Sequence, residues 1–376
     1  MTSLVYAAFL ASGWLLIYTF AGYPAGVWLL ARWRPHPIHK QNATPTVSVI
    51  MVVRDSAMHI QAKLANLGTL NYPRERMEII IACDGCRDGT PRLARRFHDR
   101  RVRVLEYPVP RGKSACINGA VADARGEVLL FTDARQTLAP IALRELVANL
   151  ADPGVGIASG ELLFTDNQSS FAQGIDTYWR YEKALRLAES QSGSTISVSS
   201  ALYAMRRELF EPLPAETVLE EVLIPMRVAA AGRRVIFEPR SLAWDRLVQQ
   251  PEQDRERRMQ TLLGHCQLIQ LAPWLLSPRG NPLWLRFVSH KLLRLAAPWL
   301  LLVLALTASV LARHRLDCLL TFGMLVLLLA LVAAGSMQPV FSRWLPVRLA
   351  LTFYYLNLFS AQALVTYARK QGTPPW

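Results

Sequence analysis

The chain has 376 residues, of which 52% are hydrophobic, and its formal net charge is +14. The length leaves room for two domains, and the charge would suit nucleic acid, anionic lipid or a phosphorylated substrate. No helix-turn-helix, zinc-finger or RNA-binding signature accompanies the charge, so we expect no nucleic acid partner. Five scattered cysteines argue against the disulfide framework of a small secreted protein.

The first apolar segment lies at the N-terminus. Residues 5–30 are apolar and uncharged, which is long enough for a transmembrane helix. A cleaved signal peptide would carry positive charge before its apolar core, whereas here Arg32, Arg34 and Lys40 follow it. The positive-inside rule then places the next residues in the cytoplasm. We therefore expect a transmembrane helix within residues 1–34 and a proline-rich linker over residues 35–45.

Residues 46–275 alternate strand-like and helix-like segments, which predicts a cytoplasmic α/β domain with a mostly parallel, doubly wound sheet. Three apolar runs end abruptly near an acid: residues 47–53 lead to Asp55, residues 77–83 to Asp84, and residues 128–131 to Asp133. If these strands are parallel neighbours, the acids line one carboxyl edge, where open α/β sheets bind ligands. Such a row would repel a bare diphosphate. Its natural complement is a divalent cation, or a sugar and base rich in donors, which favours a nucleotide-sugar site.

The other elements of this domain follow from hydrophobic periodicity and from turn residues. Further strands are expected at 102–107, 154–159, 161–164 and 201–205, and helices at 56–70, 90–98, 114–124, 140–150, 171–190, 220–231 and 249–271.

One motif imitates the end of a phosphate-binding loop. Arg111-Gly112-Lys113-Ser114 has the right ending, but Tyr107 stands where a Walker A loop needs glycine. Lys113 is therefore either a point charge that meets phosphate or ribose at the start of a helix, or a solvated surface lysine.

Two further groups of charged residues also have a functional and a structural interpretation. Glu220 and Glu221 either satisfy the charge preference of a helix N-terminus or supply a general base. Arg255, Arg257 and Arg258 form either a patch against anionic lipid or a site that neutralises a departing diphosphate.

The C-terminal region begins with an amphipathic stretch. Over residues 276–294, Trp284 and Phe287 alternate with basic residues, which suits a helix in the membrane interface. Three apolar spans follow at 295–311, 316–334 and 345–365. A soluble helical core is the alternative, but three successive, nearly uncharged segments of spanning length favour membrane helices within residues 295–376.

In chain order, the short motifs are Val47-Ser48-Val49-Ile50, Asn71-Tyr72-Pro73, Asp84-Gly85 with Asp88-Gly89-Thr90, Gly112-Lys113 with Asn118, Phe131-Thr132-Asp133-Ala134, Glu220-Glu221, Gly264, and His290-Lys291-Leu292-Leu293-Arg294. Together they resemble the membrane-embedded members of glycosyltransferase family 2, which include the cellulose, hyaluronan and poly-N-acetylglucosamine synthases. The resemblance runs from about residue 5 to residue 365 and implies a GT-A (nucleotide-diphosphosugar transferase) fold.

The resemblance implies a role for each matching residue. Asp55 takes the place of a base- or ribose-binding residue, Asp84 matches the acid that contacts uracil and ribose, and Lys113 lines the nucleotide pocket. Asp133 matches the first acid of a D-x-D metal motif. Glu221 falls where these enzymes carry their catalytic base.

Two departures from the family pattern change what the resemblance implies. Arg135 replaces the second acid of D-x-D, so Asp133 would be the only ligand of this motif for Mg²⁺ or Mn²⁺. The positive charge of Arg135 would partly replace that of the cation. Gln260 stands in the place of the arginine of a Q-x-x-R-W segment, which holds the acceptor sugar and the diphosphate in polymerising members. Its loss argues for a single or limited transfer, or for a shifted role of Arg257 and Arg258.

We therefore expect an inverting glycosyltransferase of the bacterial inner (plasma) membrane, with a UDP-sugar as donor. The acceptor would be a polysaccharide or a lipid-linked glycan in envelope or exopolysaccharide synthesis. Membrane lipid and the proteins of a polysaccharide export complex are the expected partners. The alternative is a catalytically silent glycosyltransferase-like scaffold in such a complex, which the eroded motifs would explain.

Overall fold

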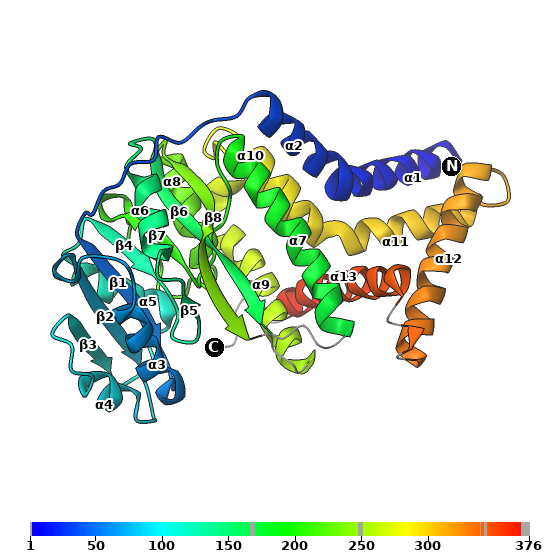
Figure 1. The fold of residues 1–376 in the computed structure, drawn as a ribbon. Coiled ribbons are helices and arrows are strands. Elements are labelled where there is room, and N and C mark those ends of the chain that lie inside the picture. The colour runs from blue at the N-terminus through cyan, green and yellow to red at the C-terminus, as the bar shows by residue number, and fades with distance from the viewer. Residues whose placement is uncertain (1, 166–169, 247–250, 339, 342–343, 370–376) are drawn as a thin grey trace.

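The computed structural model describes residues 2–165, 170–246, 251–338, 340–341 and 344–369. A sheet covered by helices occupies one end of the molecule, and long helices extend away from it at the other end (Figure 1).

Within the described residues, the strands form one eight-stranded sheet in the order β3-β2-β1-β4-β7-β6-β8-β5. Their bounds are β1 (Val47–Val53), β2 (Met77–Asp84), β3 (Val102–Tyr107), β4 (Val128–Phe131), β5 (Thr137–Leu138), β6 (Val155–Thr165), β7 (Tyr203–Arg206) and β8 (Arg234–Arg246). β1 pairs in parallel with both β2 and β4, and β2 with β3. β7 runs antiparallel to β4 and β6, while β6 and β8 are parallel. The predicted mostly parallel sheet is confirmed, with β7 and the short β5 as its antiparallel members.

Helices cover both faces of the sheet. They are α3 (Ala57–Gly68), α4 (Thr90–Arg95), α5 (Lys113–Ala122), α6 (Ala142–Leu150) and α8 (Glu220–Ala230), with short 3-10 turns η2 (Arg74–Arg76), η3 (Arg207–Leu209) and η4 (Pro273–Leu276). Successive residues of a strand point to opposite faces. Accordingly, Val49 and Met51 pack with α3, α4 and α6, while Ile50 and Leu129 pack with α5 and α8. β1 is buried along nearly its whole length for this reason.

The last part of the sheet differs from the expectation. The two extended pieces at 154–159 and 161–164 form one strand, β6, with an irregularity between Ser159 and Glu161. β8 and β5 are not foreseen, because β8 carries charged residues instead of an apolar run. The two acids of β8 are buried and have polar partners. Glu238 binds Lys40 and Asn149, and Asp245 binds Arg135.

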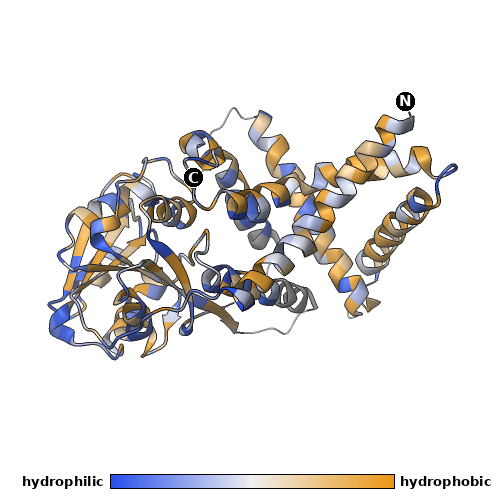
Figure 2. Ribbon diagram, turned by 90° about the horizontal axis from the view of Figure 1, so that it is seen from above, coloured by the Kyte–Doolittle hydropathy of each residue, from blue (hydrophilic) through white to orange (hydrophobic). Residues whose placement is uncertain are grey.

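Among the residues that the structure describes, four helices are long and apolar enough to cross a membrane. The first, Thr2–Trp33, consists of α1 (Thr2–Ile17), the π-helical segment η1 (Tyr18–Gly22) and α2 (Tyr23–Trp33). The second, Trp284–Leu311, consists of α10 (Trp284–Phe287), the π-helical η5 (Val288–Leu292) and α11 (Leu293–Leu311). The others are α12 (Leu316–Met337) and α13 (Leu345–Arg369). Figure 2 shows how strongly apolar this end of the molecule is.

The amphipathic stretch expected at 276–294 is not a separate helix. From Trp284 onward it continues without a break into α11, so its basic residues lie on the first turns of a candidate span. The apolar helices keep large side chains such as Trp14, Leu306 and Met324 exposed, as lipid contact requires.

Two helices connect the sheet with the apolar helices. α7 (Ser170–Gln191) packs against α2 and β8, and α9 (Pro251–Leu271) packs against α13 (Figure 1).

Candidate active site

The three predicted acids lie at one edge of the sheet. Asp84 ends β2, and Asp55 and Asp133 follow the ends of β1 and β4 by two residues each. Because β2, β1 and β4 are parallel neighbours, their carboxyl ends meet at the same rim. The structure gives the three acids different surroundings, however.

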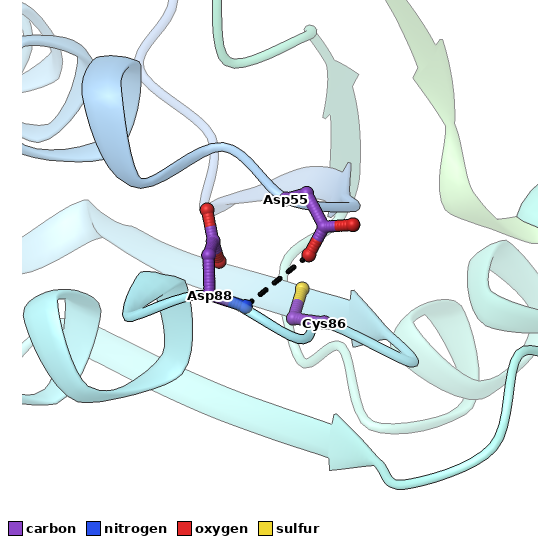
Figure 3. Close-up of side chains that lie close together, drawn as sticks. All are labelled: Asp55, Cys86 and Asp88. Atoms are coloured by element: carbon purple, nitrogen blue, oxygen red, sulfur yellow. Dashed lines mark hydrogen bonds between the residues drawn. The ribbon is translucent and has the colours of Figure 1, made fainter.

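Asp55 faces the turn after β2. Its backbone adopts a φ of +45°, and its carboxylate accepts hydrogen bonds from the N–H groups of Arg87 and Asp88, at 2.7 and 3.3 Å. Figure 3 shows Asp55, Cys86 and Asp88 around this turn. One potential metal-ligand atom of each residue lies within 4.8 Å of the other two. Burial raises the pKa of the Cys86 thiol, and a thiol is a poor partner for Mg²⁺ or Mn²⁺. Asp55 therefore connects the ends of β1 and β2.

Asp84 is buried and positions the loop before α5. Its carboxylate accepts hydrogen bonds from the N–H groups of Arg111, at 2.5 Å, and Gly112, at 3.2 Å. Gly112 has a φ of +88°, a conformation that glycine adopts without strain. The loop then delivers Lys113 as the first residue of α5.

Lys113 joins two acids from distant parts of the chain. Its Nζ lies 2.5 Å from Oε1 of Glu220 and 3.6 Å from Oδ1 of Asp133. Burial acts to lower the pKa of Lys113, but the charges of Asp133, Glu220 and Glu221 outweigh it and hold the pKa above its ordinary value. Lys113 is thus held by carboxylates and is not a free surface lysine.

These three side chains line one narrow cavity at the rim. Its other walls are Ile50, Val52, Ile117, Phe131, Thr132, Ser200 and Tyr203. The cavity has a volume of about 10 Å³, which is the space of a single water molecule, so it marks where the charged side chains converge and does not itself enclose a ligand. A larger cavity, of about 680 Å³, lies near the start of β1 and β4, at the opposite end of these strands. It contains none of the predicted site residues.

Glu220 and Glu221 begin α8 and have separate surroundings. Glu220 is buried in the cavity and paired with Lys113. Glu221 is half-buried and does not line the cavity. Burial and the neighbouring Glu220 raise the pKa of Glu221 to about 8, against the opposing charges of Lys113 and Lys291. A carboxyl group with such a pKa is mostly protonated at neutral pH, and its ionised form, which accumulates as the pH rises through 8, is a stronger base than an ordinary glutamate.

Arg135 turns away from the cavity. Its Nε and Nη2 donate to Oδ2 of the buried Asp245, at 3.0 and 2.5 Å, and Gln136 donates to the same oxygen. The residue that replaces the second acid of the D-x-D motif is therefore paired with an acid on β8, 110 residues away.

The arginines expected near the diphosphate lie on α9. Arg255 is exposed, and its Nη2 lies 3.4 Å from Oε1 of Gln362 on α13. Arg258 is half-buried and Gln260 is exposed. None of these three lines the cavity. The side chain of Arg257 lies outside the described residues.

Two site residues carry no sequence signal. Tyr203 is buried beside the cavity and stacks on Phe131, and its hydroxyl has no hydrogen-bond partner among the described residues. Lys63 is 2% exposed and donates to Oγ1 of Thr132 and to the carbonyl of Gln136, each at 2.8 Å. Burial lowers the pKa of Lys63 to about 7, although Asp133 opposes the shift. Lys63 appears in the sequence only as one residue of an amphipathic helix, so its role depends on the tertiary structure.

Comparisons with known proteins agree with this geometry. Residues 48–213 match the family model described as Glycosyl transferase family 2. Residues 48–213 therefore resemble a glycosyltransferase family 2 domain, with the GT-A fold, and the match covers the rim acids Asp55, Asp84 and Asp133.

A solved structure and two curated proteins are similar over longer stretches. The mannosyltransferase PcManGT from Pyrobaculum calidifontis, in complex with GDP-Man and Mn²⁺, is 25% identical with a TM-score of 0.72, and the alignment covers 96% of this chain and 98% of that one. The probable glycosyltransferase YdaM of Bacillus subtilis is 23% identical over 59% of this chain and 54% of its own length. The O-antigen biosynthesis protein RfbC of Myxococcus xanthus is 26% identical over 64% of this chain and 20% of its own. The chain thus spans about half or less of the length of these curated relatives.

Proposed function

We propose that the protein is an inverting glycosyltransferase that moves a sugar from a nucleotide-diphosphate donor to a hydroxyl group of a glycan or lipid-linked acceptor at a membrane. One observation carries the proposal. Lys113, Asp133 and Glu220, from three separate segments, converge in one cavity at the carboxyl edge of a glycosyltransferase family 2 sheet.

The donor would lie along this edge. Asp84 holds the loop that presents Lys113, and the Lys113 ammonium would bind a donor phosphate in exchange for part of its contact with the carboxylates. A UDP-sugar is the donor that the sequence motifs favour, while the similar PcManGT structure contains GDP-Man. Both nucleotides therefore belong in a donor screen.

A divalent cation fits this site through one protein ligand. Asp133 offers a carboxylate that is about one-third exposed, and Mg²⁺ is commonly held by one or two carboxylates together with substrate phosphates. Within the described residues, Asp133 belongs to no cluster of three or more potential ligands. Mg²⁺ or Mn²⁺ would thus be held by Asp133 together with the donor, and it would supply positive charge next to the diphosphate.

Glu221 would be the general base. It would accept the proton of the acceptor hydroxyl while the hydroxyl oxygen attacks the anomeric carbon in line with the departing diphosphate. The bond between that carbon and the diphosphate oxygen breaks, and the electron pair leaves with the nucleotide. Attack from the opposite side inverts the anomeric configuration. Glu220 is less suited to this role, because its carboxylate is paired with Lys113.

Leaving-group stabilisation would come first from Lys113. Arg135 could contribute only by giving up its pair with Asp245. The basic start of α9, with Arg255, Arg257 and Arg258, would neutralise the diphosphate only if the donor extends beyond the cavity. Contact between these arginines and anionic lipid is the competing role.

The proposed location is the bacterial inner membrane, with the sheet domain in the cytoplasm. Arg32, Arg34 and Lys40 follow the first candidate span, which supports this orientation. The proposed domain boundaries are a first membrane helix within residues 1–34, a linker at 35–45, the transferase domain at 46–275, and the helices after residue 276. A polysaccharide export complex would receive the product.

Binding and hydrolysis of labelled UDP- and GDP-sugars, with and without Mg²⁺ or Mn²⁺, test the proposal. The purified full chain in lipid nanodiscs should bind one donor class and release the nucleotide. The pair between Arg135 and Asp245, in place of a second metal ligand, favours the rival function of a silent scaffold. A scaffold would bind and hydrolyse no donor under any of these conditions.

A further inference from the structure

The C-terminal end of α7 lies where the sheet domain meets two of the candidate membrane helices. α7 ends at Gln191, and residues 192–200, here called the connecting segment, lead from it toward β7. Most of the connecting segment is buried. A helix leaves its last four backbone carbonyls without partners inside the helix. Buried carbonyls of this kind need hydrogen-bond donors from elsewhere in the protein.

Arg286, on α10, supplies several of these donors. Its Nη1 donates to the carbonyls of Glu189 and Ser194, and its Nη2 donates to the carbonyl and the hydroxyl of Ser192, at 2.9 and 3.0 Å. A Cβ atom on Gly193 would lie 3.4 Å from Arg286 Nη2, so the guanidinium closely approaches the backbone here. One side chain of the second candidate span thus holds three carbonyls at the end of α7.

The other carbonyls at this end have partners that do not involve Arg286. The N–H of His36 donates to the carbonyl of Gln191 at 2.8 Å. Arg234, on β8, donates to the carbonyls of Ser190 and Gly193, at 3.2 and 2.8 Å. Because these contacts remain when Arg286 is replaced, we expect α7 to stay docked in such a variant.

The carboxylate of Glu189 connects the same end of α7 to two candidate spans. It is fully buried and accepts a hydrogen bond from the hydroxyl of Tyr23, on α2, at 2.6 Å. Nδ1 of His290, on η5, lies 2.8 Å from the same oxygen. The second oxygen accepts a hydrogen bond from the hydroxyl of Thr195, in the connecting segment, at 3.2 Å. α2 and η5 therefore both reach the connecting segment through one side chain.

The far end of the connecting segment contacts the residues of the proposed active site. The N–H of Val198 donates to the backbone carbonyl of Glu221 at 3.0 Å. Ser200 lines the narrow cavity together with Lys113 and Glu220. The side chain of Val198 also belongs to the apolar core that joins the start of α8 to α10. The position of the connecting segment therefore affects both the first turn of α8 and the wall of the cavity.

We propose that Arg286 is a positioning residue for sugar transfer. By holding the carbonyls at the end of α7, it fixes the connecting segment and thereby the base Glu221 relative to the donor site. This inference rests on the proposed function. Arg286 does not line the cavity, so it acts through the connecting segment. A planar guanidinium suits this role because its five donors have a fixed geometry and serve several carbonyls at once.

A purely structural role of Arg286 makes a different prediction. Either role lowers the stability of Arg286→Met, because buried carbonyls lose their donor. Only a positioning role also slows transfer by protein that is fully folded. A displacement of about 1 Å in a reacting group can slow a reaction by about a hundredfold.

The test compares Arg286→Met and Arg286→Lys with the matched control Arg206→Met. Arg206, on β7, is also half-buried and also donates to three backbone carbonyls. It lines the larger cavity, at the opposite end of the strands from the proposed active site.

The full chain is assayed in nanodiscs with labelled UDP- and GDP-sugars as donor probes. Octyl glycosides and a polyprenyl phosphate are the acceptor probes, and water is the acceptor when both are left out. Donor Kd, kcat and the unfolding midpoint are measured on the same preparations. All rates are taken at a temperature well below the lowest midpoint.

Arg286→Met should lower kcat by about ten- to a hundredfold. Its donor Kd should stay unchanged, because Lys113 and Asp133 lie on other elements. Arg286→Lys keeps the charge and three donors, so its kcat should lie between those of wild type and Arg286→Met. Arg206→Met should lose stability and keep the wild-type kcat.

Thr195→Val tests the same segment without changing a charge. It removes the hydrogen bond to Glu189 and keeps a side chain of similar shape. Loss of this one bond should lower kcat by about three- to tenfold. If Arg286→Met does not fold, this variant and Arg286→Lys decide the question.

The outcomes distinguish the two proposals. Wild-type kcat in Thr195→Val and in the folded Arg286 variants would overturn the positioning role. A loss of kcat in Arg206→Met as large as that in Arg286→Met would also overturn it, because lost stability would then explain the rates. A wild-type protein that binds and hydrolyses no donor would instead remove the proposed function.

Discussion

The contact between Lys113 and Glu220 allows a quantitative test of the donor cavity. The Glu220 side chain is 3% exposed and its Oε1 lies 2.5 Å from Lys113 Nζ. Lys113→Met leaves this carboxylate buried without its cation, and breaking a buried pair costs about 3–5 kcal/mol. Because Lys113 is 30% exposed, water screens part of the pair, and we expect a loss of about 2–3 kcal/mol in the free energy of unfolding.

The double variant separates stability from donor binding. Lys113→Met with Glu220→Gln removes the unpaired charge, so the stability should recover, with a coupling energy of about 1–3 kcal/mol. Donor affinity should not recover, because the phosphate contact is lost. It should fall about ten- to a hundredfold in both variants.

Thermal unfolding in nanodiscs and calorimetric donor titration are the assays. Lys183→Met is the matched control, because Lys183 also pairs with a buried acid, Glu161, at 2.5 Å. Lys183 belongs to α7 and does not line the cavity. The control should lose stability and keep its donor affinity. The reasoning would be refuted if the stability losses of Lys113→Met and Glu220→Gln simply added up in the double variant. It would also be refuted if Lys113→Met bound the donor with wild-type affinity.

Three further predictions follow from the same geometry. The pKa of Glu221 is raised from 4.5 to about 8, so its contribution to the free energy of unfolding is present below pH 4.5 and is lost as pH rises through 8. The kcat should rise as pH passes through about 8, because the base then ionises, and a pH series of unfolding midpoints and rates checks both signs. Arg135→Ala should lower the free energy of unfolding by about 1–3 kcal/mol, because it removes a partner of the buried Asp245. Adding Asp245→Asn should restore part of the lost stability, as thermal unfolding would show. Lys63→Met should weaken donor binding about tenfold while the fold persists, because the segment that carries Asp133 loses its buried tether; equal donor Kd in both proteins would contradict this.

The sequence was informative about the sheet edge because the signal there is local. β1, β2 and β4 are buried on both faces, so each appears as an apolar run, and each run ends near an acid. Parallel pairing then brings Asp55, Asp84 and Asp133 to one rim. The four apolar helices are equally local, since span length and lack of charge are visible in sequence alone.

What the sequence could not show depends on contacts between distant residues. The partner of Arg135 is 110 positions away on β8, a strand too polar to be expected. The pair between Glu220 and Lys113, and the separate position of Glu221, follow from how α8 and α5 approach each other. A hydrophobic pattern in the sequence cannot predict which of two consecutive glutamates pairs with a distant lysine.

The continuous helix Trp284–Leu311 shows a second limit of the sequence pattern. Alternating aromatic and basic residues favour a helix lying in the membrane interface. In the structure, His290 and Arg294 instead bind the buried Glu182 on α7. The basic residues are explained by acids about a hundred positions earlier, which a local pattern does not contain.

The most direct measurement is a comparison of wild type with Glu221→Gln, in which donor Kd and the rate of sugar transfer are determined on the same nanodisc preparation. Removal of a general base should leave donor Kd unchanged and slow transfer by about 10²–10⁴-fold, because Glu221 does not line the cavity at which we propose that the donor binds. Transfer at the wild-type rate, or loss of donor binding in step with loss of transfer, would contradict this division of the site.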